Sequence, residues 1–96
     1  MESMGWLACR VARGLFPDEV AVVVATADGG KISFFMPLRR VRFTGGRTIA
    51  PEDEVDAHVP VEVIDRNDLF GLVSLPGEPI EGSRVAKVAA SLLATP

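Results

Sequence analysis

The sequence predicts a small, mainly β protein of about six antiparallel strands, arranged as two three-stranded meanders that form a small barrel or a folded sheet with short helical turns. Two observations predict this class. A three-strand pattern occurs twice along the chain, and residues typical of tight turns separate the expected strands. A chain of 96 residues is long enough to bury a core unaided, so residues 1–96 are expected to form a single small β domain.

The first meander is expected to place its strands at residues 7–11, 20–25 and 32–36. The segment Phe16-Pro17-Asp18-Glu19 predicts the first connection, because the fixed φ of proline suits the second position of a type I turn. Asp28-Gly29-Gly30 predicts the second connection, since glycine adopts a positive φ without a steric penalty. Residues 37–41 are expected to close this meander as a short turn.

The second meander is expected at residues 59–64, 69–75 and 85–89, at offsets of 52, 49 and 53 residues from the first. A connection within residues 65–68 predicts a core face formed by Val59, Val61, Val63, Phe70 and Leu72. Glu62 and Gly71 are then expected on the opposite face. Pro60 cannot donate to a strand ladder, which favours an edge position for the strand at 59–64.

Two interpretations of the C-terminal stretch are open from the sequence. The layout of the first meander predicts a strand at 85–89 followed by a short helical turn, and this interpretation is adopted for the fold class. The alternative is a helix, because Arg84, Lys87 and Ser91 recur at three- and four-residue spacing opposite an apolar side, with Ser83 as N-cap. A helix there makes the class α+β, with the C-terminal helix lying over the sheet.

The first hairpin is apolar on both faces. Its loop length places a set of large residues on one face, namely Val22, Val24, Ile32, Phe34 and Met36. The residues of the opposite face are Ala21, Val23, Ala25, Ser33 and Phe35. A half-exposed strand alternates with polar residues, so this second face is also expected to be covered. A second copy of the chain is the expected cover, in a homodimer or tetramer whose interface contains Ala21, Val23, Ala25 and Phe35.

Cover within the subunit is the alternative for this face. It requires either the C-terminal segment or the connection at residues 47–55 to lie across the outside of the hairpin. The sequence does not decide between this arrangement and self-association.

The net charge of −3 combines two blocks of opposite sign. Residues 31–50 carry +5 and residues 51–70 carry −6, and both are expected to be solvated stretches with weak mutual attraction. Small β-barrels bind single-stranded nucleic acid through basic grooves with aromatic side chains. Such a combination occurs at Arg39, Arg40, Arg42 and Phe43. These residues form the candidate binding surface of an alternative function, although the acidic net charge argues against a nucleic-acid partner.

Residues with catalytic potential are few. His58 is the single histidine and Cys9 the single cysteine, and neither has a partner at a spacing typical of a catalytic dyad or a metal site. We expect His58 at the surface or at a strand end and Cys9 in the core, with no catalytic residue, metal or cofactor. An enzyme or small-ligand site in a pocket at a subunit interface is the least favoured function class.

A lone cysteine cannot form an intrachain disulfide, which fits a reducing, cytoplasmic setting. The longest unbroken apolar run, at 20–25, has six residues and is too short to span a membrane, and the first residues lack the basic character of a secretion signal. The sequence therefore predicts a cytoplasmic binding or interaction module that self-associates and is not an enzyme. A different protein partner is compatible with the same interpretation.

Overall fold

The computed structural model describes residues 3–44, 53–80 and 82–94. Its strands are β1 (Ser3–Arg13), β2 (Glu19–Ala25), β3 (Lys31–Pro37), β4 (Arg42–Phe43), β5 (Val55–Arg66), β6 (Phe70–Ser74), β7 (Val85–Ala89) and β8 (Leu93–Ala94). Two short 3-10 turns complete the list of elements, η1 (Leu38–Arg40) and η2 (Ala90–Leu92). No α-helix occurs within these residue ranges, and the expected mainly β class is confirmed.

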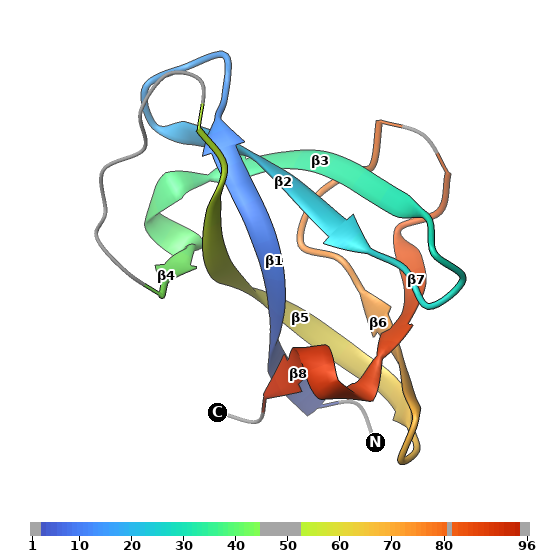
Figure 1. Ribbon diagram of the computed structural model, residues 1–96. Helices are drawn as coiled ribbons and strands as arrows, with labels where there is room; N and C mark the ends of the chain where they lie inside the picture. Colours follow the sequence, from blue (N-terminus) through green and yellow to red (C-terminus); the bar gives the residue numbers. More distant parts are fainter. Residues whose placement is uncertain (1–2, 45–52, 81, 95–96) are drawn as a thin grey trace.

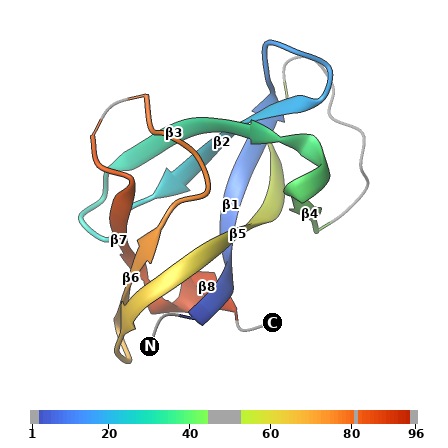
Figure 2. The ribbon, with the colours of Figure 1, turned by 180° about the vertical axis from the view of Figure 1, so that it is seen from behind.

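One antiparallel sheet contains all of these strands, in the order β3-β2-β1-β5-β6-β7, with β4 added beside β5 and β8 beside β1. The sheet curls into a half-barrel, and β1 and β5 lie side by side at its centre (Figure 1, and from behind in Figure 2). Side chains along 85–89 alternate between exposed and buried, which is the period of a strand. The α+β alternative with a C-terminal helix is therefore wrong, and the expected strand and short turn are confirmed as β7 and η2.

The two meanders repeat as complete units, β1-β2-β3-η1-β4 and β5-β6-β7-η2-β8. Each unit contributes its short last strand to the other unit, because β4 pairs with β5 and β8 pairs with β1. One backbone hydrogen bond recurs as well. The Leu38 amide donates to the Asp18 carbonyl at 2.8 Å, and the Ala90 amide donates to the Leu69 carbonyl at 2.9 Å. The repeat expected from the sequence therefore includes the turns and the closing strands.

The first unit has the expected turns and faces. The Glu19 amide donates to the Phe16 carbonyl at 3.1 Å, which closes the turn between β1 and β2. Gly29 has a φ of 89° in the β2–β3 hairpin loop, a conformation that glycine adopts without strain. The register places Val22 opposite Phe34, and both side chains are fully buried.

The second unit contains an irregularity that the sequence does not predict. The register between β5 and β6 shifts between Val63 and Asp65, so Ile64 is an extra residue on β5. A bulge of this kind reverses which side chains of the two strands share a face beyond it. Counting loop residues assumes an uninterrupted ladder, and the faces expected for β6 are consequently wrong.

The outer and inner residues of β6 are the reverse of the expected ones. Leu72 is 38% exposed and Phe70 is partly exposed, although the sequence interpretation places both in the core. Gly71, expected on the opposite face, is buried, and so is Val73. A Cβ atom on Gly71 would collide with the end of the Leu93 side chain, so any larger residue at position 71 requires that side chain of β8 to move.

Pro60 lies in the centre of the sheet, and the expected edge position is wrong. On one side of β5, Pro60 lies opposite Trp6 of β1. On the other side, β5 pairs with β4 at residues 57–58 and with β6 from residue 62 onward. Between these two partners, no described strand lies beside β5 on this side. Pro60 falls in this interval, where a residue without an amide hydrogen is tolerated.

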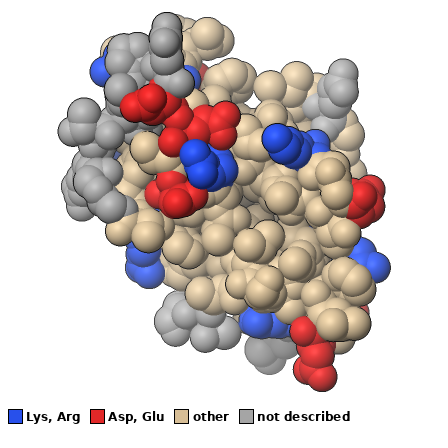
Figure 3. All heavy atoms as spheres, viewed as in Figure 1, with Lys and Arg blue, Asp and Glu red and all other residues tan. Residues whose placement is uncertain are grey.

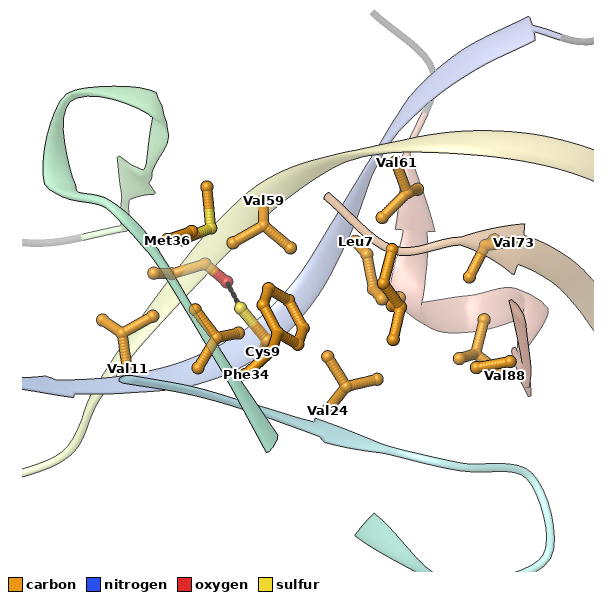
Figure 4. Packing of buried hydrophobic residues seen from close by; sticks show 14 of the residues in the cluster. Leu7, Cys9, Val11, Val24, Phe34, Met36, Val59, Val61, Val73 and Val88 are labelled. Carbon is orange, nitrogen blue, oxygen red and sulfur yellow. Dashed lines mark hydrogen bonds between the residues drawn. The ribbon is translucent and has the colours of Figure 1, made fainter. Parts of the chain in front are cut away.

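The interior of the half-barrel holds one apolar cluster that both units share (Figure 4). Its fully buried side chains include Leu7, Val11, Phe34, Val59, Val73, Leu75 and Val88. Long-range backbone contacts join the ends of the curled sheet. Pro79 forms a β-bridge with Phe34, and the Ala27 amide donates to the Lys87 carbonyl at 2.9 Å.

Candidate functional site

The outer side of the β2–β3 hairpin carries the residues that the sequence assigns to an interface. Ala21 and Val23 on β2 are half-buried, and Ala25 is exposed. Phe35 lies opposite Ala21 on β3 and is 36% exposed, whereas its neighbour Phe34 is fully buried. An aromatic ring therefore lies at the surface beside small apolar residues.

Ile80 extends this apolar area from a loop. The Pro79–Phe34 bridge and a hydrogen bond of 2.9 Å from the Ile80 amide to the Ser33 carbonyl align the loop with the edge of β3. Residues opposite each other in a ladder share a face, so Ile80 lies on the outer side beside Ser33. Its side chain is 65% exposed. We call the five residues Ala21, Val23, Ala25, Phe35 and Ile80 the hairpin face.

The described part of the C-terminal segment does not cover the hairpin face. β8 pairs with β1 at Trp6 and Leu7, whereas β2 pairs with β1 at residues 10–13. The two segments therefore lie along different parts of β1. The other cover considered within the subunit, the connection at 47–55, lies mostly outside the described residues.

An ion-paired cluster borders the hairpin face. Arg10 lies opposite Val23 and forms ion pairs with Asp56 at 3.3 Å and with Glu54 at 3.9 Å. These side chains are largely exposed, so each pair contributes only about 0–1 kcal/mol. Figure 3 shows acidic side chains gathered at one end of a face whose central area is largely uncharged. In the described ranges, Glu54 and Asp56 pair with Arg10 and not with the basic block.

The candidate surface formed by Arg39, Arg40, Arg42 and Phe43 is divided between two sides of the sheet. Successive residues of a strand point to opposite faces. Phe43 packs against the core cluster, and the guanidinium of the exposed Arg42 lies 4.1 Å from the centre of the Trp6 ring. The four residues therefore do not form one continuous groove.

A hollow of about 320 Å³ lies beside η1, on the side of β4 that holds Phe43. Its lining residues are Asp18, Leu38, Arg39, Val41 and Phe43. Arg40 is exposed and is not among these residues. The hollow thus contains two of the four residues that the sequence singles out, together with three that it does not.

Trp6 and His58 lie close to Arg42 on the outer side of the sheet. His58 is opposite Arg42 in the β4–β5 ladder, and Trp6 is opposite Pro60 in the β1–β5 ladder. His58 is half-buried and is the fourth of the 12 residues of β5, so it lies inside the strand and not at its end. The sequence interpretation omits Trp6. The sequence does contain a signal for Trp6, because the single tryptophan falls on the strand face opposite to that of the core residue Leu7.

Cys9 lies in the core, as expected, and its reactivity is suppressed. The thiol donates to the Ala57 carbonyl at 3.6 Å (Figure 4). Burial raises the pKa of Cys9 to about 12, and the negative charge of Asp56 adds to the rise. Because the thiolate is the nucleophile, this thiol is unreactive at neutral pH. His58 follows Ala57 on β5 and points to the other side of the sheet, so His58 and Cys9 do not share a site.

Within the described ranges, no group of three His, Cys, Asp or Glu side chains lies close enough together to hold a metal ion. No helix in the part of the chain that the structure describes has the length and hydropathy to cross a bilayer. No protein-family model, curated protein or solved structure matches the chain. Any function proposed for it therefore rests on its own geometry.

Proposed function

We propose that this protein is a small binding module that associates with a second copy of itself through the hairpin face. The observation that carries the proposal is Phe35, an aromatic side chain that is 36% exposed and is surrounded by Ala21, Val23 and Ile80. Burial of apolar surface contributes about 25 cal/mol per Å². A contiguous exposed apolar patch is typical of an interaction site.

A second copy is the partner that fits the shape and polarity of the hairpin face. In an isologous contact the same patch from each subunit meets its twofold-related copy, so an apolar surface covers an apolar surface. Phe35 lies opposite the small side chain of Ala21, so in a twofold contact the ring of one subunit would pack on the small residues of the other. A cytoplasmic location, where thiols stay reduced, fits the single buried thiol of Cys9.

Size-exclusion chromatography with light scattering, in low and in high salt, tests the proposal. The expected result is a dimer or tetramer that persists in high salt, because its interface is apolar. Val23→Asp and Phe35→Asp are expected to give folded monomers, with folding checked by circular dichroism. Leu15→Asp is the matched control, since Leu15 is 79% exposed and lies outside the hairpin face.

Two results overturn the proposal. A wild-type chain that is monomeric at all concentrations has no such interface. A dimer that dissociates in high salt places the contact at the ion-paired cluster around Arg10, because salt screens exposed charges and not apolar contacts.

Single-stranded nucleic-acid binding is a second candidate function, and one arrangement favours it. Within the described residues, Arg39, Arg40 and Arg42 form no ion pair with a carboxylate, and Arg42 lies over the Trp6 ring. Arginines beside an aromatic ring are the elements that sequence-independent single-strand binders use. The net charge of −3 opposes the approach of a phosphate backbone, so this function ranks second.

A further inference from the structure

The hollow beside η1 forms where the β1–β2 turn meets the end of β3. The Leu38 amide donates to the Asp18 carbonyl at 2.8 Å, and the Val41 amide donates to the Leu38 carbonyl at 3.1 Å. These backbone bonds fix the walls relative to each other. The volume of about 320 Å³ is at the lower end of the range of about 300–1,000 Å³ that small-molecule sites occupy.

The floor of this hollow is apolar and its rim is charged. Leu38, Val41 and Phe43 are partly buried and pack against the core cluster. Asp18 and Arg39 are exposed lining residues, and neither forms an ion pair within the described part of the chain. The hollow therefore presents an unpaired carboxylate and an unpaired guanidinium next to apolar side chains.

The second unit shows that the backbone turn at η1 does not require Asp18, Leu38 or Arg39. The turns η1 and η2 start 52 positions apart, and both form the same backbone bonds. In the second unit the positions of Asp18, Leu38 and Arg39 are occupied by Leu69, Ala90 and Ser91. Since the same turn forms with these residues, the fold alone does not explain an aspartate, a leucine and an arginine around the hollow.

We propose that this hollow binds a small zwitterion with an apolar body, such as an apolar α-amino acid. Arg39 binds the ligand carboxylate, because a planar guanidinium donates two parallel hydrogen bonds to it. Asp18 binds the ligand ammonium group, and the apolar side chain covers Leu38, Val41 and Phe43. A ligand with a single charge leaves one rim group without a partner. The hollow and the hairpin face share no residue, so this proposal does not depend on self-association.

Leucine is the probe for the test, titrated into the full chain and followed through backbone amide shifts in ¹H–¹⁵N NMR spectra. We expect saturable shifts at Leu38, Arg39 and Val41. N-acetyl-leucine lacks the ammonium group and leucinamide lacks the carboxylate, and each is expected to bind at least about tenfold more weakly than leucine. No saturable shift with millimolar leucine overturns the proposal, and so does equal affinity for leucine and both blocked analogues.

A matched pair of variants separates the hollow from general charge attraction. Arg39→Ser introduces the residue that η2 carries at this position and is expected to lower the affinity for leucine at least about tenfold. Arg40→Ser removes a neighbouring exposed arginine outside the hollow and is expected to leave the affinity unchanged. Equal losses in the two variants contradict the proposed role of Arg39.

Discussion

Leu7 and Val59 lie opposite each other in the β1–β5 ladder, and each is the counterpart of the other in the two units of the fold. Their separation of 52 positions is the same offset that relates η1 to η2. The ladder register is unchanged when the two units are exchanged. A pseudo-twofold axis therefore passes through this pair, and because both side chains are fully buried, the two units share one core.

Leu7→Ala is expected to lower the free energy of unfolding by about 2–5 kcal/mol, because side chains of both units surround the cavity that it leaves. Urea denaturation measures this free energy. Leu15→Ala is the control, at a position that is 79% exposed, and is expected to change it by less than about 0.5 kcal/mol. A loss in Leu7→Ala no larger than that of the control contradicts a core centred on this pair.

Gly71→Ala is expected to destabilise the protein by about 1–3 kcal/mol, because the added methyl group collides with Leu93. In a Leu93→Ala background the same change is expected to cost much less, since the smaller side chain leaves room for the methyl group. Denaturation of the four proteins in a double-mutant cycle measures the coupling. Equal losses in both backgrounds rule out the collision as the cause.

The sequence predicts the fold well where the ladder is regular and poorly where it is not. The period-two alternation and the glycine loop are sufficient to predict the faces of the β2–β3 hairpin. An error of two residues in the length of the loop would leave the same side chains on each face. The bulge at Ile64 has no local signature, since an extra residue is recognised only against a partner strand. Pro60 is likewise tolerated in a central strand, because neither β4 nor β6 pairs with β5 beside it. The sequence does not show this gap, since it depends on tertiary pairing.

The candidate sites show the same limit. Strand alternation predicts the β2 and β3 residues of the hairpin face, but Ile80 joins them through a single bridge between a loop and an edge strand. Arg42 reaches Trp6 because β4 pairs with β5, and a strand of two residues is too short to be predicted. Most of the site features that the sequence does not predict therefore arise from contacts between segments far apart along the chain.

Stability is expected to fall above about pH 9 because of Cys9. Its pKa is about 12 in the folded protein, against an ordinary value of 9.0. Between these values the unfolded chain releases the thiol proton and the folded chain keeps it. The unfolded state then binds fewer protons, so the free energy of unfolding falls as the pH rises, by at most about 1.4 kcal/mol per pH unit from this group.

Urea denaturation on either side of pH 9 measures this slope, and Cys9→Ala provides the comparison. The variant has no thiol and is expected to lose this contribution to the pH dependence. The same slope in the variant and in the wild type assigns the alkaline destabilisation to other groups.

Ile80→Asp is expected to weaken self-association without unfolding the chain, because Ile80 lies in a loop and is 65% exposed. Light scattering over a range of concentrations gives the dissociation constant, which is expected to rise at least about tenfold. Leu69→Asp is the control, at a position that is 71% exposed and outside the hairpin face. An unchanged dissociation constant in Ile80→Asp limits the interface to the two strands.

Trp6 offers a test of nucleic-acid binding, because it is the single tryptophan and the Arg42 guanidinium lies 4.1 Å from the centre of its ring. A phosphate bound by Arg42 alters the surroundings of the ring, so single-stranded DNA at low salt is expected to change the tryptophan emission. The change is expected to disappear at high salt, because counterion release drives such binding.

Arg42→Ala is expected to abolish this response, whereas Arg84→Ala, which removes the same charge from a pair with Glu78 at 3.4 Å, is expected to retain it. A response that is lost equally in both variants reflects net charge and not a site at Arg42. Unchanged emission at low salt eliminates nucleic-acid binding at this corner, and self-association through the hairpin face is then the function that the geometry supports.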